Sequence, residues 1–155
     1  MELNPLTALS PIDGRYARQT DALRDIFSEC AFMNARVRVE VEWLISLSEA
    51  GFAELPHLSD HGKAFLRGLA DNFSLADCEA IKEIEKTTNH DVKAVEYWIK
   101  NQVAHDEELK SASEFVHFSC TSEDINNTSH AIMLKRGREA LADYLQQIHD
   151  TIAGF

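Results

Sequence analysis

Long apolar runs are missing from this 155-residue sequence, and no stretch approaches the roughly 18–20 residues that a membrane-spanning helix needs. The first segment, MELNPLTALSPIDGRY, is polar and lacks the basic start and apolar core of a signal peptide. Cysteine is scarce too: Cys30, Cys78 and Cys120 are widely spaced, with no CxxC pair. We therefore predict no disulfide framework and no structural zinc site, and we expect a cytoplasmic location.

Positive charge is also in short supply. Lysine and arginine together number 15 against 26 aspartates and glutamates, which gives a net charge of −11. General affinity for nucleic acid requires a surplus of clustered lysine and arginine, so we expect no nucleic-acid partner. A small anionic ligand remains compatible with this composition, because the local charge of a pocket can oppose the global one.

Strand patterns and internal repeats are absent, whereas helical periodicity is strong. Apolar residues recur every three or four positions between Thr20 and Ala50, which predicts a helix with a break at Ser28 and a stop at Gly51. The sequence predicts an all-α fold. Further helices are expected over residues 61–72, from Ser74 to about Thr87, and over residues 91–103 with Asp91 as the N-cap.

The longest predicted helix follows the segment Thr121-Ser122-Glu123-Asp124 and carries apolar residues as far as Ile152. Roughly thirty helical residues would measure about 45 Å. A domain of this size cannot bury such a stripe alone, so we expect the front part of a larger helical protein. The predicted division is an N-terminal helical domain over residues 1–119 and the start of a truncated helical-bundle domain over residues 120–155.

Polar side chains gather in three short segments: SPIDGRY (10–16), TTNHD (87–91) and HFSCTSED (117–124). In the first, turn residues present Arg15 and Tyr16 at a loop exit. A guanidinium fork beside a phenol suits a phosphate or a carboxylate. The alternative is a surface arginine next to a packing tyrosine.

The second segment places a histidine beside a helix start, where an imidazole can reach a ligand held by free backbone N–H groups. The third carries polar side chains for two helical turns, more than capping needs, which suits an anion site. Ordinary capping and a solvated first turn are the respective alternatives. His57 and His61 are four residues apart but lie near a loop without a third ligand, so we predict no metal site.

Three stretches resemble a known family: SPIDGRY, TTNHDVKAVEYW and EFVHFSCTSEDINNTSHA match, in order and spacing, the bacterial adenylosuccinate lyases of the fumarase/aspartase superfamily. The resemblance implies the N-terminal helical domain of that fold plus the start of its first long central-bundle helix. It also implies β-elimination of fumarate from adenylosuccinate to give AMP, and from the succinylocarboxamide ribotide SAICAR to give AICAR. It implies no cofactor, and a homotetramer when the protein is full length.

The resemblance also implies roles for individual residues. Arg15 and Tyr16 correspond to binders of the nucleotide phosphate, and Thr121 and Ser122 correspond to binders of the succinyl carboxylate. These four positions come from the first and third polar segments, which are separated by about a hundred residues along the chain.

Asn89, His90 and Asp91 fall on the family's substrate-contacting segment, with His90 in a supporting role near the succinyl group or the leaving nitrogen. His117 is expected close by, toward the phosphate. The family's acid/base histidine and base serine come later than residue 155. We therefore expect no catalytic residue in this chain, which would supply one part of a shared site and be inactive alone.

Two other functions remain open at this point. One is another lyase of the superfamily, such as an argininosuccinate lyase, although the stretch NHDVKAVEYW argues against it. The other is a helical interaction module without a ligand, whose polar segments are caps and surface. In that case the segments would be scattered in space.

Overall fold

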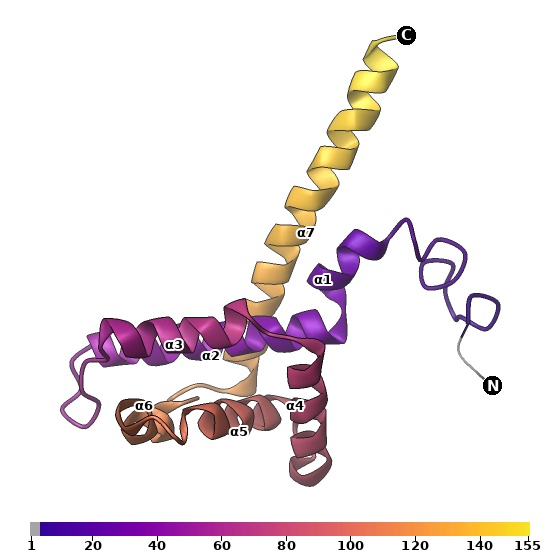
Figure 1. Cartoon of the computed structure of the whole chain (residues 1–155). Helices are drawn as coiled ribbons and strands as arrows, with labels where there is room; N and C mark the ends of the chain where they lie inside the picture. Colours follow the sequence, from indigo (N-terminus) through magenta and orange to yellow (C-terminus); the bar gives the residue numbers. More distant parts are fainter. Residues whose placement is uncertain (1–3) are drawn as a thin grey trace.

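The computed structural model describes residues 4–155, and every regular element in that range is helical (Figure 1). The predicted all-α fold is confirmed. Helices α2 and α3 form one layer and α5 and α6 form a second, while α4 stands across one end of both layers and α7 passes α2 and projects beyond it (Figure 1). The helices are α1 (Arg24–Phe27), α2 (Glu29–Glu49), α3 (Asp60–Asp71), α4 (Leu75–Thr88), α5 (Asp91–Val103), α6 (Glu107–Ala112) and α7 (Ser122–Ala153), with 3₁₀ turns η1 (Asp21–Leu23) and η2 (Ser113–Phe115).

The predicted break at Ser28 is confirmed. Ser28 has an extended backbone (ψ 163°), and its hydroxyl accepts a hydrogen bond from the N–H of Ala31 at 3.2 Å, so it caps α2. At the other end α2 stops at Glu49, and Gly51 adopts the left-handed φ of 81° that a glycine tolerates without strain. Helix α6 was not predicted. Its cap is Asp106, whose carboxylate accepts from the N–H of Leu109 at 2.9 Å.

The core lies between the two layers, and α2 contributes many of its buried apolar side chains. Its three- and four-residue spacing places Val37, Val41 and Leu44 in one cluster with Trp98 and Ile99 of α5. Each fully buried aliphatic side chain of this size contributes about 1.5–3 kcal/mol relative to exposure. Because α2 also contacts α3, α4 and α7, it is the element against which the others are packed.

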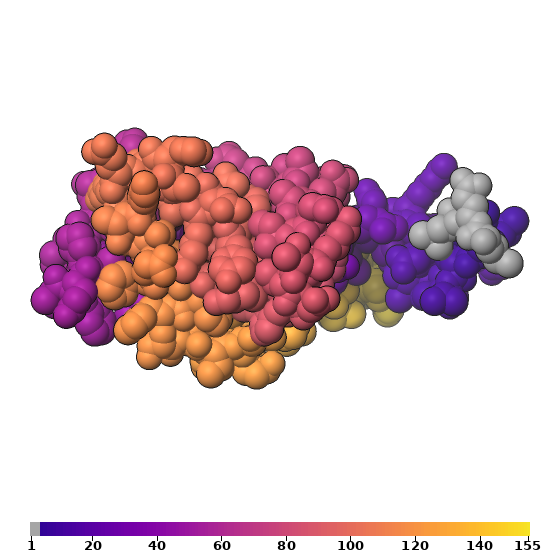
Figure 2. Space-filling model, turned by 90° about the horizontal axis from the view of Figure 1, so that it is seen from below, coloured from indigo at the N-terminus to yellow at the C-terminus, as the bar shows by residue number. Residues whose placement is uncertain are grey.

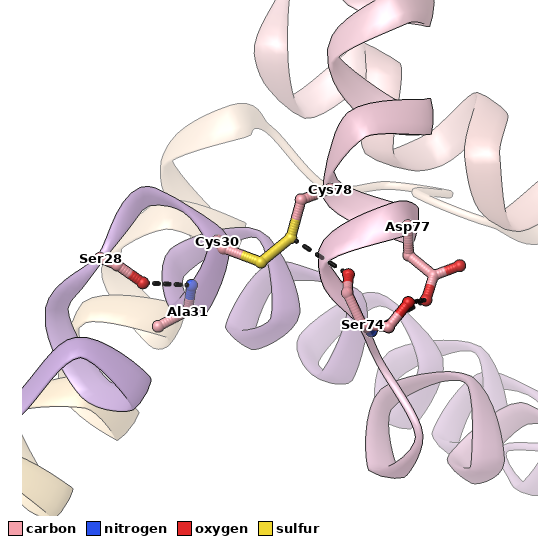
Figure 3. The surroundings of a disulfide bond; sticks show 6 residues. All are labelled: Ser28, Cys30, Ala31, Ser74, Asp77 and Cys78. Atoms are coloured by element: carbon pink, nitrogen blue, oxygen red, sulfur yellow. Dashed lines mark hydrogen bonds between the residues drawn. A yellow bond between two sulfur atoms is a disulfide. The ribbon is translucent and has the colours of Figure 1, made fainter. Parts of the chain in front are cut away.

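A disulfide joins Cys30 to Cys78, so the expectation of no disulfide was wrong. Cys30 lies in the first turn of α2 and Cys78 in the first turn of α4, and Figure 3 shows the bond crossing between them. The two residues are 48 positions apart, and only the packing of α4 against α2 brings their Cα atoms to 5.6 Å. Spacing along the chain carries no sign of that proximity. Cys120 is a free thiol.

Helix α7 is buried over only its first half. Ile125, Ser129, Met133 and Gly137 follow one another at four-residue intervals and face α2 and α1. The apolar residues of its second half are exposed, as expected for a stripe that this chain cannot cover: Leu141, Leu145, Ile148 and Ile152. Within residues 4–155 no helix combines the length and hydropathy that crossing a bilayer requires.

Gly137 permits the contact between α1 and α7. A Cβ atom at this position would lie 2.3 Å from Cζ of Phe27, far inside van der Waals contact. Glycine lowers helix propensity at this position, but a larger residue would clash, because the aromatic ring of Phe27 in α1 occupies the space that a side chain would need.

We expect Gly137→Ala to lower the free energy of unfolding by about 1–2 kcal/mol, because displacing the Phe27 ring costs more than the gain in helix propensity. In a Phe27→Ala background the same substitution should instead raise stability by about 0.5–1 kcal/mol. Chemical denaturation of the four proteins of this cycle measures both. Equal effects in the two backgrounds would show that the ring does not set the cost.

We expect Cys30→Ser to lower the free energy of unfolding by about 2–4 kcal/mol under oxidising conditions, because the disulfide closes a long loop in the unfolded chain. Cys120→Ser is the matched control and should change stability little. Reductant should remove most of the difference between wild type and Cys30→Ser. A wild-type unfolding midpoint that is the same with and without reductant would contradict this prediction.

Candidate functional site

Two helix N-termini meet at the candidate site. Nε2 of His90, at the start of α5, lies 3.4 Å from Oγ of Ser122, at the start of α7. The second and third polar segments, 32 residues apart at this contact, are therefore brought together. The free N–H groups and dipoles of two helix starts both favour an anionic ligand at such a junction.

The start of α5 is capped by His90, so the prediction that Asp91 is the N-cap was wrong. Nδ1 of His90 accepts a hydrogen bond from the N–H of Lys93 at 3.1 Å, and Asp91 is the first helical residue. Asn89 ends α4 in the left-handed conformation (φ 49°), which asparagine tolerates, and so turns the chain into α5. The carboxylate of Asp91 accepts from the N–H of Val92 through Oδ1 at 2.9 Å and binds the guanidinium of Arg36 through Oδ2.

The cap fixes the tautomer of a neutral His90 ring. Because Nδ1 accepts from Lys93, the ring proton resides on Nε2, the nitrogen that faces Ser122. His90 therefore offers an N–H donor to Ser122 or to a ligand at the same place. A ring in this state cannot also take up a proton through Nε2, which fits a supporting role rather than that of a base.

Arg36 of α2 joins the first turns of α5 and α7. It is 5% exposed, and its guanidinium contacts Oδ2 of Asp91 at 2.6 Å and Oδ1 of Asn126 at 3.0 Å. The guanidinium carbon also lies 3.8 Å from the ring centroid of Phe32. Burial acts to raise the pKa of Asp91, but the N–H of Val92 and the Arg36 guanidinium together hold that pKa below its ordinary value.

Sequence reasoning missed Arg36 and, one turn further along α2, Glu40. Both directly precede an apolar residue of the α2 stripe, Val37 and Val41 respectively, and only the apolar residues of that stripe entered the sequence-based prediction. The available signal was the four-residue spacing of two opposite charges next to a continuous apolar row. It becomes informative only once α2 is known to be covered on several sides.

The start of α7 is capped as predicted. Oδ2 of Asp124 accepts from the backbone N–H of Thr121 at 2.7 Å and from its hydroxyl at 2.9 Å. These bonds, together with a weaker effect of His117, hold the pKa of Asp124 below its ordinary value. The Thr121 hydroxyl is thus committed to its cap, whereas among residues 4–155 the side-chain hydroxyl of Ser122 contacts only His90, at 3.4 Å.

His117 lies on the loop that leads into α7, with a left-handed backbone (φ 63°). Its Nδ1 is 2.6 Å from Oε1 of Glu40. The loop is anchored to α2 a second time, because the indole N–H of Trp43 donates to the carbonyl of Phe118 at 2.8 Å. His117 therefore sits between α2 and the first turn of α7, five residues before Ser122 along the chain.

Arg15 and Tyr16 lie apart from this group. Both are exposed, on a segment of turns that projects to one side of the helical body (Figures 1 and 2). No hydrogen bond or ion pair between residues 4 and 155 joins either side chain to His90, His117 or Ser122. The structure thus brings the second and third polar segments together but not the first, and phosphate binding by Arg15 and Tyr16 stays a prediction.

A separate groove of about 550 Å³ opens between α2 and α7, lined by residues that include Trp43, Cys120, Asp124 and Thr128. Asp124 and Thr128 are on the opposite flank of α7 from Ser122, given the helical repeat. The His90–Ser122 junction itself is open to solvent, since the His90 and Asp91 side chains are both half exposed. In the part of the chain that the structure describes, no group of three or more potential ligands is arranged for a metal ion.

The helical layers and the pair of capped helix starts define an all-helical protein with an open polar site at the junction of two helix N-termini. A family model described as a lyase matches residues 14–154, and the chain belongs to this family, whose helical domain is of the fumarase/aspartase type. The predicted resemblance to that superfamily is confirmed.

Curated relatives agree with this assignment. The chain is 56% identical over 142 residues to the adenylosuccinate lyase of Vibrio cholerae, a match that covers 91% of this chain and 31% of the relative. It is 53% identical over 154 residues to that of Haemophilus influenzae and 51% identical over 154 residues to that of Escherichia coli K12, covering 98% of this chain and 34% of each relative. The chain thus spans about a third of the length of these relatives.

We expect Asp91→Asn to lower the free energy of unfolding at pH 7 by about 1–2 kcal/mol, because the buried Arg36 loses its charged partner while Asp91 itself is half exposed. Since the folded-state pKa of Asp91 lies below its ordinary value of 3.8, this contribution is present above pH 3.8 and is lost as the pH falls through the folded-state pKa. Wild type and variant should therefore converge in acid.

Asp71→Asn is the matched control, because Asp71 pairs with Arg38 at 2.7 Å where both side chains are exposed to solvent. Its cost should stay below about 1 kcal/mol. Urea denaturation over a pH series from 7 down to about 2 measures both variants. A loss for Asp91→Asn that is no larger than the control would mean that the Arg36 contact does not stabilise the junction.

Proposed function

We propose that a full-length protein carrying this chain eliminates fumarate from adenylosuccinate to give AMP and from SAICAR to give AICAR. The observation that carries the proposal is the contact between His90 and Ser122. It joins the two segments, TTNHDVKAVEYW and HFSCTSEDINN, that resemble the adenylosuccinate lyases most closely in residue type. The relatives that bear this name, 51–56% identical over nearly the whole chain, support the same activity.

The chemistry of the elimination fits what the junction offers. Removal of a proton from the succinyl group leaves a carbanion whose negative charge spreads onto the neighbouring carboxylate. Donors aimed at that carboxylate stabilise the transition state. In this chain the donors are the first-turn N–H groups of α7, the hydroxyl of Ser122, and Nε2–H of His90. Thr121 contributes by capping α7 together with Asp124, which holds that first turn in place.

The other predicted site residues have two proposed roles: some position His90 and α5, and others bind the phosphate of the substrate. Asn89 turns the chain so that His90 reaches Ser122, and Asp91 holds α5 to Arg36. Arg15 has no ion-pair partner among residues 4–155, so its guanidinium is available for a phosphate, with Tyr16 beside it. His117 is placed toward the same phosphate. Arg15 and Tyr16 would meet the rest of the site through segments or subunits beyond this chain.

Catalytic proton transfer is assigned to residues later than this segment: an acid/base histidine and a base serine. The proposal therefore includes inactivity of the 155-residue chain alone, a homotetramer for the full-length protein, and a cytoplasmic location. The elimination needs proton transfer and charge stabilisation only, so no cofactor or metal is part of it. The substrates are the small molecules adenylosuccinate and SAICAR.

The test is a fumarate-release assay on a full-length enzyme that carries these 155 residues. We expect His90→Ala to lower kcat/KM for adenylosuccinate by about a hundredfold, because one donor to the developing charge is lost. His105→Ala is the control: His105 is an exposed histidine just past the end of α5, and its removal should leave kcat/KM unchanged. Loss of the α5 cap costs about 1 kcal/mol, so the melting temperatures of both variants must be recorded.

Three results would overturn the proposal. The first is an unchanged kcat/KM in a folded His90→Ala variant, which would remove the junction from the substrate site. The second is release of fumarate from argininosuccinate but not from adenylosuccinate, which would assign the chain to another lyase of the superfamily. The third is absence of any fumarate release, which would favour a helical module without catalysis.

A further inference from the structure

Glu40 is an ionisable side chain in the middle of the core, outside the proposed substrate contacts. It is 0% exposed. Oε1 lies 2.6 Å from Nδ1 of His117, and Oε2 is buried without a hydrogen-bond partner among residues 4–155. A buried carboxylate with one free oxygen is costly, so its remaining hydrogen bond to His117 is expected to be held firmly.

The charges around Glu40 leave His117 as its side-chain donor. From α5, Glu96 faces Glu40 but is itself neutralised by Lys93 at 2.7 Å and Lys100 at 3.2 Å. Cys120 of the loop and Asp124 of α7 are the other titratable groups nearby, and neither donates to Glu40. Burial raises the pKa of Glu40 above its ordinary value, and the hydrogen bond with His117 opposes part of that rise.

The loop geometry serves the same contact. His117 and Ser119 both adopt left-handed backbones, with φ of 63° and 60°, which residues with a Cβ rarely adopt. Such conformations persist where the surrounding structure fixes them. Here Val116 is buried in the core, and the carbonyl of Phe118 accepts a hydrogen bond from Trp43. The imidazole of His117, between these two residues, is hydrogen-bonded to Glu40.

We propose that Glu40 is a positioning residue that selects the Nδ1–H tautomer of His117 and fixes its ring, leaving Nε2 as an acceptor for the ligand. A charged Glu40 carboxylate can only accept, so Nδ1 carries the proton while Glu40 is ionised, and Nε2 of the neutral ring then carries a lone pair. His90 is held in the opposite tautomer by its cap. The two histidines are thus held in opposite tautomers: His90 donates through Nε2, and His117 accepts through Nε2.

The tautomer assignment stands on the Glu40 contact alone, whereas its effect on turnover rests on the proposed function. Nε2 of His117 has no partner among the described residues, so it can accept from an N–H or O–H of the substrate. Glu40 acts through His117 and does not touch the substrate.

The first experiment reads the tautomers of His117 and His90 in the 155-residue chain by ¹⁵N-histidine NMR, over a pH series in which the neutral rings are populated. Wild type should show His117 as Nδ1–H, with a downfield and slowly exchanging proton, and His90 as Nε2–H. Glu40→Leu should return His117 to the Nε2–H form that free imidazole side chains prefer. Glu40→Gln, which keeps the shape and removes the charge, should reduce the share of Nδ1–H.

Glu96→Gln is the matched control, a buried carboxylate in the same core that does not contact His117. It should leave the His117 tautomer unchanged, and none of the Glu40 variants should alter that of His90. A wild-type His117 in the Nε2–H form would overturn the proposal. So would an Nδ1–H form that persists in both Glu40 variants.

The second experiment measures kcat/KM for adenylosuccinate in the full-length enzyme. Glu40→Gln should lower it by about 10–100-fold, the loss expected for a charged hydrogen bond, and should cost nothing further in a His117→Gln background. Equal losses in the two backgrounds would show that Glu40 does not act through His117. If the wild-type enzyme releases no fumarate, the proposed function fails while the NMR result still decides the tautomer.

Discussion

The buried guanidinium of Arg36 is the interaction on which this structure depends most. It joins three helices that are distant in sequence, since Arg36 belongs to α2, Asp91 to α5 and Asn126 to α7. A charge in this position cannot be left unpaired, so the starts of α5 and α7 are drawn to the same point. The contact between His90 and Ser122 follows from that arrangement. The core orders the layers, but the arginine determines which helix ends face each other.

Much of the fold was predictable because its signals are local. The apolar period, the serine at the break before α2 and the capping pair Thr121 and Asp124 each act within one or two turns. The predictions failed where a distant partner changes what a residue does. Asp91 is a normal capping residue, but Arg36 occupies its carboxylate and His90 takes over the cap. The Cys30 disulfide likewise depends on how α4 packs against α2.

The candidate site shows the same division. Two of its polar segments were expected to meet and do so through Ser122, because each begins a helix and helix starts carry unsatisfied N–H groups. The support beneath them was not foreseen, since Arg36 and Glu40 look like surface charges on an amphipathic helix. Arg15 stands apart on the projecting segment. No hydrogen bond or ion pair among residues 4–155 ties its side chain to the other two polar segments, so neither capping nor packing within these residues determines where it points.

Helix α7 extends on both sides of its contact with Phe27, so a change in its tilt moves the residues at its start. Ser122 lies in its first turn, Gly137 packs against Phe27 near its middle, and the apolar residues of its second half are exposed. The distance along the helix from Gly137 to Ser122 is about 22 Å, so a tilt of about 5° around that contact would move Ser122 by about 2 Å. A hydrogen bond tolerates far less. Burial of Ile125, Ser129 and Met133 against α2 and α1 therefore fixes the alignment of the Ser122 hydroxyl, so the packing of α7 as far as Gly137 sets the binding geometry at the junction.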